Sequence, residues 1–280
     1  MGKHDGYLAD GFRDVDNNTD VSKFEACLRF LEKLPSIETY KKKSIERLRL
    51  KQGDTALDLG CGLGFDVPKM ARLVSPGGRS VGIDSSEKLL DSARRAFSGC
   101  EGVSFVQGDI HDLQIPSNSV NGIRVDRTLQ HVRDPQKVIS EMVRVLKPGG
   151  WLVCAEPDWS TFVIDADDNE VTNTVVRTWS GSFENPHIGR QLLRRVRSEG
   201  LENTWAEGFV LLADGLTAVD TVYDLYATVR RAKTENEEMS SAIDAWLNGQ
   251  VRRDDHEGVI ACVTIFLAGG QKCEYKDSRK

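Results

Sequence analysis

The sequence predicts an α/β fold built on a doubly wound parallel sheet. Between residues 55 and 157, short apolar segments that indicate strands alternate with segments of helical periodicity, without long gaps. This alternation is typical of parallel strands joined by right-handed crossovers, with helices on both faces. Three of the expected strands end at an aspartate, and open sheets of this kind bind ligands at that edge.

The first 50 residues precede the sheet and are expected to be helical. After a polar opening, apolar residues recur at helical spacing up to Pro35, which is expected to close the first helix. A second helix is expected over residues 39–50. We therefore divide the chain into an N-terminal helical segment, residues 1–50, and a core, residues 51–280.

The first expected strand, residues 55–59, runs into closely spaced glycines. Asp58 stands before them, and the helix that follows is expected to begin near Phe65. Glycine allows backbone angles that other residues avoid, so the main chain can approach a ligand closely. The unpaired N–H groups of the helix start can then face that ligand. This pattern predicts a nucleotide-binding turn at Gly60, Cys61, Gly62 and Gly64.

The next two expected strands also end in acidic residues. Residues 78–84 end at Asp84, about 20 residues beyond the glycines, where doubly wound folds place the acid that binds ribose hydroxyls. Residues 103–110 end in Gly-Asp-Ile. There, Asp109 could accept from an adenine amino group while Ile110 packs on the ring.

These strand ends, with residues 124–135 and the Lys-Pro-Gly-Gly turn at 147–150, resemble the class I S-adenosylmethionine-dependent methyltransferases. The turn is similar to that of the small-molecule branch, which includes ubiquinone, menaquinone and natural-product O-methyltransferases. The resemblance covers roughly residues 36–212. It implies a Rossmann-like seven-stranded sheet with an antiparallel last strand, an N-terminal helical cap and helical insertions over the active site.

The resemblance also implies S-adenosylmethionine as cofactor and a set of residues that bind it. The glycine turn would hold its amino-acid end, Asp84 and Ser85 its ribose, and the residues after the fourth strand would flank its sulfonium. Arg127 there could meet a carboxylate of cofactor or substrate, or pair with Asp126 or Asp84. The expected cofactor-binding residues are Asp58, Gly60, Cys61, Gly62, Asp84, Ser85, Asp109, Ile110, Arg127 and Gln130.

A nicotinamide-dependent dehydrogenase is the main rival, since it also uses glycines and an acid after the second strand. The dinucleotide fingerprint is G-x-G-x-x-G, whereas this turn reads Gly-Cys-Gly-Leu-Gly. Asp58, directly before the glycines, would repel a pyrophosphate. A carboxylate there suits a cofactor that carries an ammonium and a sulfonium.

Beyond residue 157 the sequence predicts additions to the core. Residues 158–186 are expected to form an irregular insertion, followed by an amphipathic helix over 189–200 and a sixth strand over 201–212. A second, mostly helical insertion is expected at about 215–257. The last strand is expected over 259–268.

Methyl transfer from a sulfonium is an in-line displacement, so the enzyme mainly aligns the acceptor and excludes water. A hydroxyl or amine acceptor must lose a proton, and histidine is the first candidate for the base. His131 follows the fourth strand, where similar O-methyltransferases use a histidine. Alternatively, it is a helix-start residue bonded to a backbone carbonyl. Glu156 and Asp158 could orient its imidazole.

Aromatic residues near this region are candidates for the acceptor pocket. Trp159 could form an aromatic wall beside His131. Tyr7, Phe12 and Tyr40 could shield the substrate from the N-terminal cap, or could only pack the cap against the core. His187 could touch substrate, although a loop histidine is more often structural or solvated.

Composition limits the partners. The chain has 37 basic and 43 acidic residues, a net charge of −6, which provides no basic field for nucleic acid. The basic runs at 41–43 and 194–197 are interpreted as solvated helix faces. No segment is long enough to span a membrane, and the six cysteines lack zinc-site spacing. We expect a cytoplasmic monomer or homodimer without a metal.

The sequence leaves three functions open. The first is methylation of a small organic acceptor, most simply O-methylation in secondary metabolism. The second is C-methylation of a quinone-like ring or N-methylation of an amine. The third, from another class, is a cofactor-binding protein that transfers no methyl group.

Overall fold

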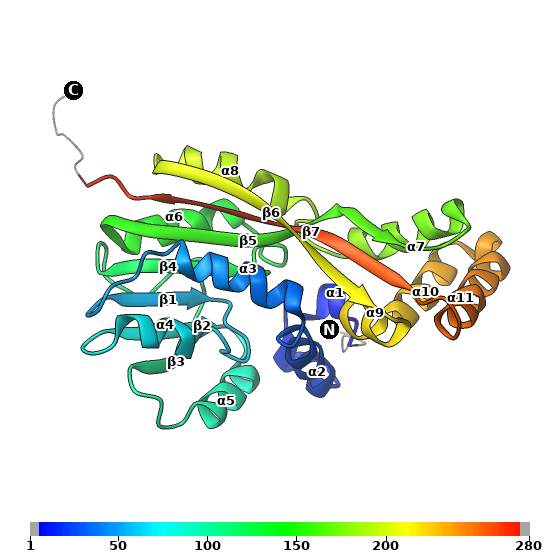
Figure 1. Ribbon diagram of the computed structural model, residues 1–280, viewed down its shortest axis with the longest axis horizontal. Coiled ribbons are helices and arrows are strands. Elements are labelled where there is room, and N and C mark those ends of the chain that lie inside the picture. The colour runs from blue at the N-terminus through cyan, green and yellow to red at the C-terminus, as the bar shows by residue number, and fades with distance from the viewer. Residues whose placement is uncertain (1–5, 275–280) are drawn as a thin grey trace.

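The computed structural model describes residues 6–274, which form one seven-stranded sheet flanked by helices (Figure 1). The strand order is β3-β2-β1-β4-β5-β7-β6, and β1 to β5 run parallel. Strand β7 is antiparallel to both β5 and β6. The predicted fold class, including the antiparallel last strand, is confirmed. The strands are β1 (Thr55–Leu59), β2 (Arg79–Asp84), β3 (Val103–Gln107), β4 (Val120–Asp126), β5 (Leu146–Ile164), β6 (Glu202–Asp214) and β7 (Ile260–Gln271).

The strand order reverses at β1. The chain proceeds from β1 to β2 and β3 on one side, and continues from β4 to β5 on the other. Ligands bind beyond the carboxyl ends of the strands at such a switch point. The connecting helices are α4 (Val67–Val74), α5 (Glu87–Ala96) and α6 (Pro135–Val145), and α8 (Ile188–Ser198) precedes β6.

Two of the connecting helices, α5 and α6, begin at residues that cap the unpaired N–H groups of the helix start. Ser86 accepts from the Leu89 N–H at the start of α5, and Asp134 accepts from the Lys137 N–H at the start of α6. Pro135, at the first position of α6, has no N–H that needs a partner. Each helix buries an apolar stripe against the sheet, and this packing fixes the loops at the carboxyl ends of the strands.

The N-terminal segment is helical, as predicted, with one boundary misplaced. It contains α1 (Leu8–Gly11), a short 3-10 turn η1 (Val15–Asn17), α2 (Val21–Leu31) and α3 (Pro35–Glu46). Pro35 does not close the first helix but opens the second, because proline is pre-organised for the first helical position. The predicted start at residue 39 is therefore late by one turn.

The segment 158–186 is not irregular, and that prediction was wrong. Strand β5 continues to Ile164, where Val163 pairs with Cys262 of β7, and α7 (Asn169–Gly181) follows. The apolar side chains of Trp159 and Phe162 are buried in this extension. Their burial favours continued pairing with β7, even though Pro157 in the middle of the strand can donate no hydrogen bond.

The second insertion is mostly helical, as predicted. It comprises α9 (Leu216–Tyr223), α10 (Leu225–Glu235), a 3-10 turn η2 (Glu237–Met239) and α11 (Ser240–Asp254). Figure 1 shows α7 and α9 to α11 gathered at the far end of the long strands β5, β6 and β7, where α9 also contacts α2. These helices and the N-terminal helices together form a cap beside the carboxyl ends of the core strands.

Residues 6–274 show neither a membrane-spanning helix nor a cluster of metal ligands. In this part of the chain, no helix has the length and apolar character that crossing a membrane requires. The same residues contain no cluster of three or more His, Cys, Asp or Glu side chains placed to hold a metal ion.

Candidate active site

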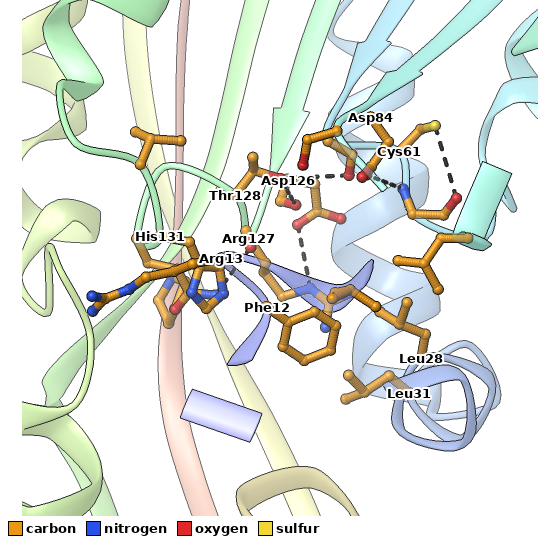
Figure 2. A pocket seen from close by; sticks show the side chains of 18 of the residues that line it. Phe12, Arg13, Leu28, Leu31, Cys61, Asp84, Asp126, Arg127, Thr128 and His131 are labelled. Atoms are coloured by element: carbon orange, nitrogen blue, oxygen red, sulfur yellow. Dashed lines mark hydrogen bonds and ion pairs between the residues drawn. The ribbon is translucent and has the colours of Figure 1, made fainter. Parts of the chain in front are cut away.

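A cavity of about 980 Å³ lies at the carboxyl ends of β1, β2 and β4 and extends under the helical cap. One part, here called the turn half, is lined by Asp58, Gly60, Cys61, Gly62, Asp84, Ser85, Asp109, Ile110 and His111. The other part, the aromatic half, is lined by Phe12, His131, Trp159, Trp179, Phe183, Leu211, Val222, Tyr223, Val263 and Ile265. Figure 2 shows Asp84 and Cys61 on one side, His131 on the other, and Asp126 and Arg127 between them.

The glycines of the turn are required by backbone conformation and by close approach. Gly60, Gly62 and Gly64 all have positive φ angles, of 67°, 53° and 71°. A Cβ atom on Gly60 would lie 2.1 Å from Thr128 Oγ1. The Gly60 N–H donates to the carbonyl of Ile83, at a distance of 2.7 Å, which ties the turn to β2. The turn is thus a bare main-chain surface that faces the cavity.

Asp84 stands at the end of β2 and lines the cavity, as predicted. Its Oδ2 atom accepts from the Gly62 N–H at 2.8 Å, and its Oδ1 atom accepts from the Ser86 N–H at 2.9 Å. Burial raises the pKa of this carboxyl group, and the backbone donors oppose that shift. Asp84 therefore connects the glycine turn to the start of α5 while it borders the cavity beside Ser85.

Asp109 and Ile110 also line the turn half. Ile110 is buried, whereas the Asp109 side chain is largely exposed and bonds to the next residue but one. Asp109 Oδ1 accepts from the His111 N–H at 2.8 Å and lies 2.7 Å from His111 Nδ1. These contacts, the backbone hydrogen bond first, lower the pKa of Asp109.

Asp58 lines the cavity but is tied to a partner that the sequence analysis missed. It is buried, and its Oδ1 atom lies 3.1 Å from Arg124 Nη1. Arg124, on β4 and only 1% exposed, also contacts Asp66 at 2.9 Å and Asp126 at 2.6 Å. Burial raises the pKa of Asp58 to about 7. A single arginine inside an otherwise apolar strand was the signal for this cluster.

A lysine from α3 completes this buried charge cluster. Lys41 is buried, with its Nζ atom 2.9 Å from Asp66 Oδ2 and 2.8 Å from Glu32 Oε2. The interpretation of residues 41–43 as a solvated helix face was therefore wrong for Lys41. The cluster joins the N-terminal cap to β1 and β4 directly beneath the glycine turn.

The turn after β4 lies where the two halves of the cavity meet. Arg127 has a positive φ of 51°, and its Nε atom is buried without a hydrogen bond, 3.6 Å from Asp126 Oδ1. The expected ion pair with Asp126 is present. Gln130 donates to the Arg127 carbonyl at 3.0 Å and accepts from Trp159 Nε1 at 2.8 Å. Gln130 thus holds the aromatic wall against this turn.

His131 lies on the same turn, with its imidazole between Phe12 and Phe183. The ring centroids are 5.7 Å and 5.5 Å apart. Its Nδ1 atom is buried and has no hydrogen-bond partner in the described chain. Burial, together with the charges of Arg13 and Arg127, lowers the pKa of His131 to about 3. The imidazole is therefore neutral near pH 7, and a ring nitrogen can accept a hydrogen bond from a ligand.

Glu156 and Asp158 do not orient His131, contrary to the sequence-based expectation. Neither lines the cavity, and both side chains are fully buried with other partners. Glu156 Oε1 accepts from the N–H groups of Thr128 at 2.8 Å and Leu129 at 2.6 Å. Asp158 pairs with Arg190 of α8 through two hydrogen bonds. Glu156 supports the turn that carries His131, and Asp158 anchors α8.

The aromatic half is walled by rings from several elements. Trp159 of β5 stacks on Phe183 with centroids 4.5 Å apart, and Trp179 of α7 meets both rings edge to face. Tyr223 of α9 lies 6.2 Å from Trp159. The predicted aromatic wall at Trp159 is therefore present. Of the three N-terminal aromatic candidates, Phe12 lines the cavity, whereas Tyr7 and Tyr40 are buried in the packing.

The remaining candidate, His187, lies outside the cavity lining. It is half-exposed, and its Nδ1 atom lies 2.9 Å from Ser160 Oγ. This arrangement agrees with the structural alternative rather than with substrate contact.

Comparisons with known proteins agree with this geometry. Residues 50–200 match the family described as methyltransferase domain. An uncharacterised 37.1 kDa protein in transposon TN4556 of Streptomyces fradiae is 36% identical over 237 residues, which cover 83% of this chain and 67% of the relative. Demethylmenaquinone methyltransferase of Staphylococcus aureus is 32% identical over 127 residues, 45% of this chain. The chain spans about half of that relative's length, 53%.

A solved structure shows the same fold at low sequence identity. Phosphoethanolamine N-methyltransferase 2 of Haemonchus contortus, in complex with S-adenosyl-L-methionine, superposes with a TM-score of 0.58 at 18% identity. The match covers 93% of this chain and 60% of that chain.

The strand order and the glycine turn beside Asp84 define a class I S-adenosylmethionine-dependent methyltransferase. The chain belongs to the methyltransferase domain family. Its cofactor is S-adenosylmethionine, and the turn half suits that molecule. The bare glycine backbone leaves room for it, and Ile110 offers an apolar face. Arg127 Nε is a buried donor without a hydrogen bond, 3.6 Å from Asp126 Oδ1.

Proposed function

We propose that the chain moves the methyl group of S-adenosylmethionine to a hydroxyl of an apolar, ring-bearing small molecule, in secondary metabolism. The observation that carries this proposal is the neutral His131, whose buried Nδ1 atom has no partner where the two halves of the cavity meet. In this proposal, His131 accepts a hydrogen bond from an acceptor hydroxyl. The cytoplasmic location and the monomeric or homodimeric state remain predictions from the sequence.

In this proposal, the turn half and the turn after β4 bind the cofactor together. Asp84 and Ser85 bind the ribose hydroxyls, Asp109 and Ile110 bind the adenine, and the glycine turn holds the amino-acid end. Arg127 meets the cofactor carboxylate through its guanidinium, whose Nε–H makes no hydrogen bond in the described chain. Asp58 acts on the cofactor's ammonium group only as part of the cluster around Arg124, because one of its oxygens is already paired.

The cofactor supplies a methyl group that is already activated on sulfur. The carbon–sulfur bond breaks as the bond to the acceptor oxygen forms, and S-adenosylhomocysteine leaves. His131 accepts the hydroxyl proton and passes it to solvent. The aromatic walls align the acceptor and exclude water, which is the main requirement of an in-line displacement.

The charge of the aromatic half argues against a cationic amine as acceptor. Among the described residues that line the cavity beside the aromatic half, the carboxylates are those of Glu184, paired with Arg13 at 3.0 Å, and Asp126, paired with Arg124 at 2.6 Å. An ammonium group buried without a counter-ion is strongly unfavourable. A neutral or weakly acidic hydroxyl has no such penalty.

A second candidate is C-methylation of a quinone-like ring. The flat stacked wall of Trp159 and Phe183 supports it, as does the 32% identity to a demethylmenaquinone methyltransferase. In that reaction, His131 would accept the proton of a ring hydroxyl while a ring carbon receives the methyl group.

Methyl transfer from tritiated S-adenosylmethionine tests these alternatives. The acceptors are matched by ring system: 2-naphthol, 2-naphthylamine and 1,4-naphthoquinol. We expect label in the methyl ether of the naphthol. Label only on the amine or on a ring carbon would contradict O-methylation. Cofactor binding with no transfer to any acceptor in a wider panel would favour the non-catalytic function.

A further inference from the structure

The aromatic half contains a second polar atom without a partner. Trp179 is 3% exposed, and its Nε1 atom is buried without a hydrogen-bond acceptor in the described chain. A buried donor without an acceptor costs about 1–3 kcal/mol. Buried indole N–H groups therefore usually find a partner.

Two other tryptophans in the chain follow that rule. The Trp159 N–H donates to Gln130 Oε1 at 2.8 Å, and the Trp246 N–H donates to Thr172 Oγ1 at 2.9 Å. Trp205 Nε1 also lacks a partner, but Trp205 lies outside the cavity, under the guanidinium of Arg47. Among these residues, Trp179 alone combines an unpaired buried N–H with a place in the cavity lining.

No oxygen of the described chain accepts a hydrogen bond from Trp179 Nε1. The rings near it belong to Tyr7, Trp159, Phe162, Phe183 and Tyr223, with centroids 5.3–6.5 Å away. The Tyr7 hydroxyl is bonded to Thr228, and that of Tyr223 lies 3.4 Å from the Leu211 carbonyl. Because Trp179 lines the cavity, a molecule bound there can supply the acceptor that the indole N–H lacks.

Trp179 and His131 are neighbours along one wall. The Phe183 ring lies 5.3 Å from Trp179 and 5.5 Å from His131, so a single phenyl ring separates the two unpaired groups. Both residues line the same cavity, so one ligand can contact both. Its His131 end requires a hydroxyl, its Trp179 end requires a hydrogen-bond acceptor, and the surface between must be flat and apolar.

We propose that the acceptor is a fused-ring phenol with a carbonyl oxygen at the end opposite the reacting hydroxyl, and that Trp179 Nε1–H donates to this carbonyl. This inference rests on the proposed function and deepens it. Trp179 then determines specificity, because an analogue without the carbonyl leaves the N–H unpaired.

The test uses two probes that differ in one group. 6-Hydroxy-1-tetralone has the carbonyl, and 5,6,7,8-tetrahydro-2-naphthol has a methylene in its place. Their dissociation constants are measured by calorimetry on the full chain with S-adenosylhomocysteine bound, so no transfer is needed. We expect the wild type to prefer the ketone, and Trp179→Phe to reduce that preference about 3- to 10-fold, the value of one hydrogen bond.

Trp159→Phe is the matched control, because it removes an indole from the same wall whose N–H is bonded to Gln130. It should weaken both probes equally. If Trp179→Phe does not fold, as judged by thermal unfolding, benzothienylalanine at position 179 keeps the ring shape and removes only the N–H. An unchanged preference in either Trp179 variant would overturn the proposal, as would a wild type that does not favour the ketone.

The binding experiment tests the carbonyl site and the transfer assay tests the proposed function, so either claim can be wrong without the other. If no methyl group is transferred but the preference falls in the Trp179 variant, the proposed function is wrong and the carbonyl site stands. If naphthol is methylated and the preference does not change, the function stands and Trp179 only packs.

Discussion

At the scale of single residues, the proposed reaction depends on the environment of His131. The ring is enclosed by Phe12 and Phe183 and lies near two arginines, so its protonated form is disfavoured. A base whose pKa lies near 3 is always available at neutral pH but accepts a proton weakly. Such a base suits an acidic phenol better than an aliphatic alcohol.

His131→Ala should lower kcat by about 10²-fold, near the lower end of the range for a positioned base. The affinity for S-adenosylmethionine should change little, because the imidazole is assigned to the acceptor. Steady-state kinetics with the phenol that serves as acceptor measures kcat. Calorimetry measures the affinity for S-adenosylmethionine. Near-normal turnover would mean that alignment of the acceptor and exclusion of water suffice for catalysis, without a general base.

The same residue predicts a pH dependence of stability. The pKa of His131 is about 3 in the folded chain and 6.5 in the unfolded chain, so unfolding takes up a proton between these values. Stability is then retained well above pH 6.5 and lost as pH falls, by about 1.4 kcal/mol at pH 5.5. His131→Leu should lack this loss. Urea unfolding of both proteins from pH 5 to 8 measures the difference, and parallel curves of stability against pH would contradict the burial of a neutral imidazole.

The pH profile of kcat/KM gives a second test of the same residue. An imidazole titrating near 6.5 would give an inflection in kcat/KM at that pH, which we do not expect.

Asp84→Ala should weaken cofactor binding by about 1.5–3 kcal/mol, the usual value for charge-assisted hydrogen bonds to two hydroxyls. Because Asp84 also accepts from Gly62 and Ser86, thermal unfolding must show that the variant is folded. Asp109→Ala is a useful comparison, since the loss of its exposed carboxylate should weaken cofactor binding less than Asp84→Ala does. Unchanged affinity in a folded Asp84 variant would refute the ribose assignment.

For single residues, the sequence predicted which residues follow the strands and line the cavity. It did not predict the hydrogen-bond and ion-pair partners of the buried carboxylates. Asp84, Asp109, Ile110 and His131 all line the cavity, since strand ends in a parallel sheet share an edge. The partners of Asp58, Glu156 and Asp158 come from distant segments of the chain. Local patterns do not show which buried arginine or N–H a carboxylate will meet.

At the scale of elements, β5 organises the site. Glu156 at its core end accepts two N–H groups of the turn after β4, and Trp159 a few residues later forms the aromatic wall. The extended strand was missed because Pro157 and Asp158 are typical of strand ends. Pairing with β7 over the same residues outweighs that local preference.

Glu156→Ala should destabilise the fold by roughly 3 kcal/mol, because at least two buried N–H groups lose their acceptor. Turnover should fall as well, since His131 is on the released turn. Glu156→Gln keeps one carbonyl oxygen and should recover part of both losses. Denaturant unfolding and kcat are the measurements. Full stability of the Glu156→Ala variant would show that the turn does not depend on this contact.

At the scale of the whole molecule, a buried ion cluster joins the cap to the core. Arg124 of β4 contacts Asp58, Asp66 and Asp126, and Lys41 of α3 contacts Asp66. Its members are separated by up to 85 residues of sequence, which is why no motif revealed it. The cluster fixes the floor of the cavity from both sides.

Arg124→Met should destabilise the chain by about 3–5 kcal/mol, the cost of leaving buried charges unpaired. The loss should be larger at pH 8 than at pH 5.5, because the carboxyl pKa values, already about 7 for Asp58, rise further without the arginine. Arg94→Met is the control, since its pair with Glu87 is exposed and is worth less than about 1 kcal/mol. Equal, small effects from both substitutions would show that the cluster contributes no net stability.

The central claim is that a cofactor in the turn half donates its methyl group to an oxygen in the aromatic half. The most direct test is carbon NMR of the product formed from S-adenosylmethionine labelled with ¹³C at its methyl group, with a hydroxylated fused-ring ketone as acceptor. We predict a labelled methoxy carbon whose formation slows sharply in His131→Ala. A label on nitrogen or on a ring carbon, or methoxy formation that is unaffected by His131→Ala, would contradict the account.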